Sequence, residues 1–394
     1  MNSILDKEPV KRAEKSIKEF DPSLKIVCLE QTARTAQDAA TALGCNVGAI
    51  VKSLLFSTGE NFVLCLVSGD KRCSLNKLKK ILDEKDVSMA NPDDVKKITG
   101  YTIGGVSPVG HLSKLKIYID TNLERFTKVI DGVDGNQIKL YVHKPEGLES
   151  KVPGILHIHG GGMSILKASN PNYIRWRDDL ASTGLVVVGV EFRNVAGELG
   201  SHPFPAGLND CSSALQWMFD NKEKLGVSKI IVSGESGGGN LTLATTLKAK
   251  KDKKLFQIDG VYAQCPYISN EYHRSINNLP SLVENDGYFL NVKDMAVMAT
   301  AYDGVDSKNP LAWPLFATTE DLTGLPPHVI SVNELDPLRD EGLLYYKKLL
   351  IAGVDASSIT INGTVHAGDM IFIKVTPKIY RSSLMHINNF ANSL

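Results

Sequence analysis

Gly234-Glu235-Ser236-Gly237-Gly238 indicates the fold of this chain more clearly than any other segment. An apolar run at 229–233 precedes it, and a helix-like run begins at Asn240. A G-x-S-x-G sequence between a strand and a helix is the pattern of a nucleophile elbow, a sharp turn that exposes the serine hydroxyl. The glycines are needed because only a residue without Cβ lets the strand and the helix pack this closely. Ser236 is therefore the candidate nucleophile.

A glycine-rich loop offers groups that would stabilise a developing oxyanion. His159-Gly160-Gly161-Gly162 follows the apolar run 154–158. Backbone N–H groups at the end of a strand can point at the oxyanion of an acyl-transfer reaction. We expect the donors to be Gly161, Gly162 and, from the elbow, Gly237, with His159 and Gly160 supporting the loop.

Asp336 and His366 are the candidate acid and base. Asp336 follows the apolar run 329–332, and His366 lies in the segment 363–368. The chain order serine, aspartate, histidine is that of α/β-hydrolases rather than that of chymotrypsin-like or subtilisin-like proteases. Asp340 is the alternative acid, although a cap on the helix that follows is the better interpretation of this residue.

The pattern of apolar runs predicts an α/β fold from residue 127 onward. The runs that alternate with helix-like segments are 155–158, 186–190, 230–232, 260–263, 329–332 and 358–361. This alternation is typical of a mostly parallel sheet with helices on both faces. A hairpin made of 127–130 and 138–142 precedes it. The insertion at about 272–312 is too long for an ordinary loop, and we expect it to form a helical lid.

The part from about residue 122 to 394 resembles the hormone-sensitive-lipase group of α/β-hydrolase carboxylesterases. The resemblance rests on H-G-G-G at 159–162, G-E-S-G-G at 234–238 and D-P-L-R-D at 336–340, and bacterial acetyl-ester hydrolases share the stretch 280–288. It implies a serine carboxylesterase for short-chain acyl esters that needs no cofactor. Amides remain alternative substrates, because the same triad cleaves both kinds of bond.

The first 126 residues have a different pattern, which predicts a smaller α+β domain. Two runs at 50–56 and 61–68 form a hairpin, 75–82 and 91–99 are helix-like, and 116–120 is a further strand. We therefore place the domain boundary between 1–126 and 127–394.

This N-terminal domain resembles the YbaK/prolyl-tRNA-editing family of aminoacyl-tRNA deacylases, in a form whose C-terminal end is incomplete. The matching segments are 51–56, 67–70 and 99–110. The resemblance implies a pocket for the 3′ end of a mischarged tRNA, lined by Lys52, Gly104, Gly105 and Ser107. The residues alone favour a solvent-facing lysine and ordinary turns. A protein that deacylates or binds aminoacyl-tRNA is accordingly the alternative function.

Composition sets the remaining expectations. The 394 residues carry a net charge of +0, so no overall field steers the chain toward nucleic acid or an anionic membrane. Six cysteines without a C-x-x-C pair indicate buried free thiols of a reducing, cytoplasmic compartment. No signal peptide, membrane span or metal motif is apparent in the sequence. The expected partner is a small-molecule ester, with tRNA and a homodimer as open alternatives.

Overall fold

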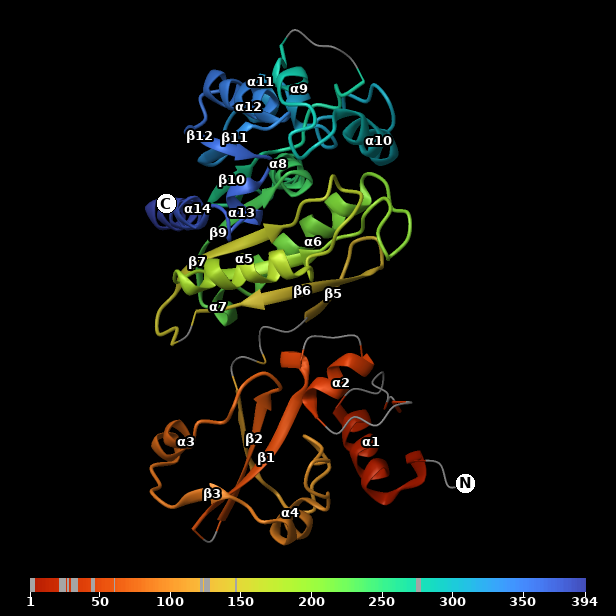
Figure 1. The fold of residues 1–394 in the computed structure, drawn as a ribbon, viewed down its shortest axis with the longest axis vertical. Helices are drawn as coiled ribbons and strands as arrows, with labels where there is room; N and C mark the ends of the chain where they lie inside the picture. The colour runs from red at the N-terminus through yellow and green to blue at the C-terminus, as the bar shows by residue number, and fades with distance from the viewer. Residues whose placement is uncertain are drawn as a thin grey trace. The chain divides into compact units, whose positions relative to one another are not determined.

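The computed structural model describes residues 4–20, 26, 28–29, 35–43, 47–59, 61–120, 123, 128–145, 147–273 and 278–394. The chain divides into two compact units, Met1–Phe126 and Thr127–Leu394, which Figure 1 draws from red to blue along the sequence. None of the helices in the described ranges is both long enough and apolar enough to cross a membrane.

The N-terminal unit contains a four-stranded sheet in the order β3-β1-β2-β4. Its strands are β1 (Val51–Thr58), β2 (Asn61–Ser68), β3 (Val87–Met89) and β4 (Lys116–Ile119). Its helices are α1 (Glu8–Phe20), α2 (Ala36–Leu43), α3 (Leu75–Leu82) and α4 (Pro92–Thr99). The β1–β2 pair is the expected hairpin, and α3, α4 and β4 lie where the sequence predicts them.

The ends of α3 and α4 follow from local chemistry. The Ser74 hydroxyl accepts a hydrogen bond from the N–H of Lys77 at the start of α3. Asn91 does the same for Asp94 at the start of α4, which ends at Gly100 in the left-handed conformation. Such caps satisfy backbone groups that a helix end leaves without partners.

The C-terminal unit is built on an eight-stranded sheet in the order β12-β11-β10-β9-β7-β8-β6-β5. The strands are β5 (Lys128–Asp131), β6 (Gln137–His143), β7 (Val152–Ile158), β8 (Val186–Glu191), β9 (Val227–Glu235), β10 (Gly260–Gln264), β11 (His328–Leu335) and β12 (Ala356–Val365). Strands β7 to β12 run parallel, and β6 pairs antiparallel with both β5 and β8. The predicted hairpin and mostly parallel sheet are confirmed.

Helices cover both faces of this sheet, as Figure 1 shows. The larger core packs side chains of α6 (Ala206–Asp220), α8 (Gly237–Lys251) and α12 (Arg339–Ile351) against the strands. The second core does so with α5 (Pro171–Ser182) and α14 (Pro377–Ser393). Along β7, Ile155 belongs to the second core, whereas Leu156 and Ile158 belong to the first, as the alternation of a strand requires.

The insertion at 272–312 contributes two helices, α9 (Ser281–Glu284) and α10 (Val292–Asp303); its residues 274–277 lie outside the described ranges. The remaining helices are α7 (Lys222–Leu225), α11 (Thr319–Leu322) and α13 (Gly368–Ile371).

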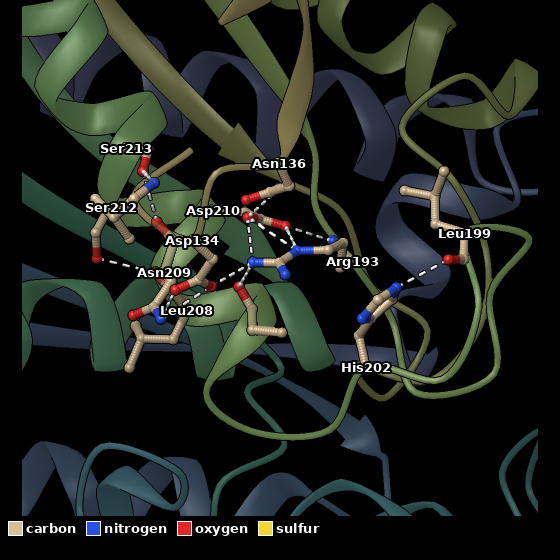
Figure 2. Close-up of polar contacts among 12 residues, drawn as sticks. Asp134, Asn136, Arg193, Leu199, His202, Leu208, Asn209, Asp210, Ser212 and Ser213 are labelled. Atoms are coloured by element: carbon tan, nitrogen blue, oxygen red, sulfur yellow. Dashed lines mark hydrogen bonds and ion pairs between the residues drawn. The ribbon is translucent and has the colours of Figure 1, made fainter. Parts of the chain in front are cut away.

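An arginine network ties the β5–β6 turn to helix α6 (Figure 2). The Arg193 guanidinium, just after β8, donates to both carboxylate oxygens of the buried Asp210 and, at 2.6 Å, to Asp134 of the turn. Asn136 of the same turn donates to Asp210 at 3.0 Å. The hydrogen bond with Arg193 holds the pKa of Asp134 below its usual value. The hairpin at the edge of the sheet is therefore fastened through its turn to the helix layer.

Candidate active site

The backbone of Ser236 forms a strained turn between β9 and α8. Its φ of 58° and ψ of −121° lie outside the regions that a serine ordinarily adopts. The Ser236 N–H donates to the Gln264 carbonyl at 3.0 Å, and the Ser236 carbonyl accepts from Asn240 and Tyr267. Such a conformation costs on the order of 1–3 kcal/mol and persists only where surrounding contacts enforce it.

Two glycines of the turn are required by space. A Cβ on Gly234 would lie 2.3 Å from the Ile158 carbonyl oxygen, and one on Gly238 would lie 2.0 Å from the same atom. The two glycines and the Ile158 carbonyl cannot move apart without breaking the pairing of β7 with β9. The close packing expected at the elbow is therefore present, and Ser236 is left partly exposed at its apex.

Asp336 and His366 form a buried pair. The His366 Nδ1 lies 2.8 Å from Asp336 Oδ2, and because a carboxylate only accepts, the ring nitrogen donates. The other Asp336 oxygen accepts from the Leu338 N–H at 2.9 Å, and the Asn285 amide holds the Asp336 carbonyl. Burial by itself lowers the pKa of His366, but the Asp336 carboxylate outweighs it and raises the pKa above the ordinary histidine value.

The sheet brings this pair to the edge that carries Ser236. Ser236, Asp336 and His366 follow β9, β11 and β12, whose carboxyl ends lie at one edge of the parallel sheet. Cys265 follows the intervening strand β10, and its sulfur lies within 4.8 Å of a ring nitrogen of His366. Since Ser236 is bonded through its N–H to Gln264, the residue before Cys265, the serine and the histidine flank the end of the same strand.

Asp340 has a different role from the one expected. Its carboxylate accepts from the Ser281 N–H at 2.6 Å and from Arg339 Nε at 2.9 Å. The N-cap of α12 is Leu338, without a side-chain cap, so the predicted cap is wrong. The backbone of the first turn is held by Asp336 instead, through the N–H groups of Leu338 and Arg339. Asp340 serves to fasten the insertion to α12.

The glycine loop lies against the elbow. Gly161 and Gly162 have φ values of 101° and 59°, which favour glycine. A Cβ on Gly237 would lie 2.7 Å from the Gly162 nitrogen and 2.6 Å from the Met163 nitrogen. Within the described part of the chain, the N–H groups of Gly161, Gly162 and Gly237 donate to no protein acceptor. These amides are therefore available to an oxygen atom above Ser236.

Buried polar side chains hold the backbone of the glycine loop in place. His159 Nδ1 lies 2.8 Å from the Gly160 carbonyl, and its ring stacks on Phe192 at 4.3 Å between ring centroids. Burial lowers the pKa of His159 to about 3, so the ring is neutral and Nδ1 donates. The Gly160 N–H donates to Glu235 at 2.6 Å, and His157 Nε2 lies 3.4 Å from that carboxylate.

The insertion borders the same loop. A Cβ on Gly162 would lie 2.8 Å from the Met298 sulfur, so this side chain of α10 rests on the glycine. Phe289 of the insertion packs edge-to-face against Phe372, six residues after His366, with 5.4 Å between ring centroids. Helix α10 and its neighbouring loop therefore delimit the space above the oxyanion donors.

Comparison with known proteins agrees with this geometry. The family described as the alpha/beta hydrolase fold matches residues 155–369, which include Ser236, Asp336, His366 and the glycine loop. The chain belongs to the α/β-hydrolase family.

Its relatives in this family include named esterases. An arylesterase of Saccharolobus solfataricus is 36% identical over 222 residues, which are 54% of this chain and 67% of the relative. Carboxylesterase NlhH of Mycobacterium tuberculosis is 29% identical over 306 residues, 76% of this chain and 90% of the relative. The structure of brefeldin A esterase, a bacterial homologue of human hormone sensitive lipase, superposes with a TM-score of 0.66 at 47% identity, covering 70% of this chain and 80% of the other. The resemblance to the hormone-sensitive-lipase group is confirmed.

The N-terminal unit of this α/β-hydrolase also matches a family. The aminoacyl-tRNA editing domain matches residues 30–146, so the predicted resemblance is confirmed, and the match continues into β5 and β6. A cavity of about 430 Å³ in this unit has Lys52 and Gly104 in its lining. Gly105 and Ser107 are not part of that lining, and Ser107 accepts a hydrogen bond from the Val109 N–H.

The Lys52 ammonium of this cavity is engaged within the protein. It donates to the Gly69 carbonyl at 3.1 Å and to the Lys71 carbonyl. An ammonium group has three N–H donors, so these two carbonyls leave one donor for a further acceptor such as a phosphate. Binding of an aminoacyl-tRNA end by this cavity stays a prediction.

Glu341 is a buried carboxyl that no sequence pattern singled out. It lies on α12, five residues after Asp336, and accepts from the Ile268 N–H at 2.6 Å and the Tyr272 hydroxyl at 2.8 Å. Burial raises the pKa of Glu341 from 4.5 to about 8. The carboxyl thereby anchors the chain where it leaves the sheet and enters the insertion.

We expect Glu341→Gln to gain stability over the wild type as pH rises. The folded protein keeps the Glu341 proton up to about pH 8, whereas the unfolded chain loses it near pH 4.5. Between those values the unfolded state binds fewer protons, so the wild type loses stability with increasing pH, and the glutamine variant does not share that loss. Urea unfolding of both proteins at pH 5 and pH 8 measures the gap. Glu320→Gln, at an exposed glutamate, is the control. A free energy of unfolding of Glu341→Gln that falls relative to that of the wild type between pH 5 and pH 8 contradicts the assignment.

Proposed function

We propose that this protein is a serine carboxylesterase that hydrolyses short-chain acyl esters. Its family membership and its esterase relatives support ester hydrolysis. The single observation that carries the residue assignment is the 2.8 Å hydrogen bond between His366 and Asp336, buried beside the strained turn of Ser236. A histidine fixed in this way presents its other nitrogen, Nε2, as a base.

In the proposed reaction, Ser236 Oγ attacks the ester carbonyl while His366 Nε2 takes the hydroxyl proton. His366 then returns that proton to the leaving alcohol, and a water molecule repeats both steps to release the acid. Asp336 keeps the proton of His366 on Nδ1 and stabilises the imidazolium that forms. No metal or redox cofactor enters these steps.

The amides of Gly161, Gly162 and Gly237 hold the negative oxygen of the tetrahedral intermediate in this scheme. Each such donor contributes roughly 3 kcal/mol to lowering the barrier, because it is already oriented when the charge develops. Glu235 and His159 position the loop that carries two of these amides, since they bind the N–H and the carbonyl of Gly160.

We expect acyl chains of about two to six carbons to be preferred, because Met298 occupies space directly above the oxyanion loop. A series of p-nitrophenyl esters of increasing chain length gives kcat/KM for each. Met298→Ala should shift the optimum toward longer chains, whereas Val297→Ala, at an exposed neighbour on the same helix, should not. Faster turnover of long-chain triglyceride emulsions than of soluble acetate or butyrate esters contradicts the proposal.

A further inference from the structure

Three different metal-binding side chains meet at the end of β10, β11 and β12. The sulfur of Cys265, a carboxylate oxygen of Asp336 and a ring nitrogen of His366 lie within 4.8 Å of one another, and all three residues are buried. No other trio of histidine, cysteine or acidic side chains comes this close among the described residues. The sequence contains no metal motif because the three ligands come from separate strand ends.

The backbone directs the Cys265 thiol to this place. Cys265 has a φ of 34°, in the left-handed region that side-chain-bearing residues rarely adopt. Its N–H donates to the Ser331 carbonyl of β11 at 2.7 Å, which fixes the turn. The thiol is therefore held against His366 by the same strand ends that hold the proposed catalytic groups, and the mechanism above makes no use of it.

We propose that Cys265, Asp336 and His366 form a binding site for Zn²⁺, and that the ion inhibits the enzyme when it binds there. One thiolate, one imidazole and one carboxylate are ligands that Zn²⁺ takes in tetrahedral sites. With bonds of about 2.0–2.3 Å, tetrahedral ligand atoms lie roughly 3.3–3.6 Å apart, so the three side chains need to shift by about an ångström or less. Water completes the coordination.

The bound ion would prevent the transfer of the Ser236 proton to His366. Binding replaces the thiol proton of Cys265, which passes to solvent, and where Nδ1 of His366 is the ligand its proton leaves as well. No electron is transferred, and a chelator restores the original state. With Asp336 and His366 coordinated, the histidine loses the orientation and charge partner that it needs to accept the proton of Ser236. The inhibition rests on the proposed function, whereas the binding of the ion does not.

Zinc titration of the purified full-length enzyme tests the proposal. Wild-type hydrolysis of p-nitrophenyl butyrate should fall as Zn²⁺ is added and recover with a chelator. Cys265→Ser and Cys265→Ala, each measured relative to its own rate without zinc, should need roughly a hundredfold more zinc for half-inhibition, since a ligand is lost. Cys211→Ser, at a buried free cysteine of α6, should behave as wild type. Equal zinc sensitivity of wild type and the Cys265 variants overturns the proposal.

X-ray absorption at the zinc edge gives a second readout that needs neither activity nor a cysteine variant. Wild-type protein and Ser236→Ala, each loaded with one equivalent of Zn²⁺, should show one sulfur neighbour at about 2.3 Å. A shell of nitrogen and oxygen alone overturns the site even if the Cys265 variants fail to fold. If the sulfur shell is present but Ser236→Ala still hydrolyses esters, the proposed function fails and the metal site stands.

Discussion

Replacing Ser236 by alanine is expected to abolish ester hydrolysis, with a loss in kcat on the order of 10⁶-fold, as when the nucleophile of a serine hydrolase is removed. Alanine keeps the Cβ and therefore the strained backbone of the turn, with its φ of 58°. The loss should consequently appear without a change in folding. Turnover of p-nitrophenyl butyrate measures the activity, and thermal unfolding measures the stability.

Ser233→Ala is the matched control for this variant. Ser233 lies on the same strand, β9, three residues earlier, is buried, and its hydroxyl has no hydrogen-bond partner among the described residues. We expect this variant to remain close to wild type in both activity and stability. More than a trace of wild-type activity in Ser236→Ala would show that Ser236 is not the nucleophile.

Asp336→Asn is expected to reduce turnover by roughly 10⁴-fold, the effect of removing the orienting acid in serine triads. An asparagine oxygen can still accept from the Leu338 N–H, which the native carboxylate does at 2.9 Å. Its neutral amide, however, cannot stabilise a positive His366 and permits the wrong tautomer. The decrease should therefore appear in kcat and much less in the melting temperature.

Asp340→Asn provides the comparison. The Asp340 carboxylate binds Ser281 and Arg339 and fastens the insertion to α12, so its loss should lower turnover far less than the loss of Asp336. Steady-state kinetics of the two variants on the same ester show which substitution lowers turnover more. The reverse ranking would assign the acid to Asp340.

Features that depend on local chain chemistry are predictable from the sequence. The β1–β2 hairpin, the helices α3 and α4, and the parallel strands were all expected from apolar periodicity, caps and turn residues. The nucleophile elbow could also be predicted, because its glycines at 234 and 238 are visible in the sequence. In the structure, a Cβ at either position would collide with the Ile158 carbonyl oxygen of the neighbouring strand. Strand ends in a parallel sheet meet at one edge, and this places the expected acid and base near the serine.

Contacts between side chains that come from different loops could not be predicted from the sequence. Cys265 contacts His366 only because β10 lies between β9 and β11 in the sheet, an order that the chain does not reveal. Glu341 is buried because the chain after β10 passes over α12, and Met298 reaches Gly162 through the fold of the insertion. The expected cap by Asp340 failed for the same reason, since Ser281 of the insertion takes its carboxylate.

Covalent labelling of the nucleophile is the most direct test of the role of Ser236. An organophosphorus fluoride transfers its phosphonyl group to an activated serine and releases fluoride, and peptide mass spectrometry then locates the added mass. We expect one group per chain, on Ser236, formed in step with the loss of esterase activity and absent from Ser236→Ala. Labelling of a different residue in step with inactivation, or unlabelled Ser236 in an inactivated enzyme, would contradict it.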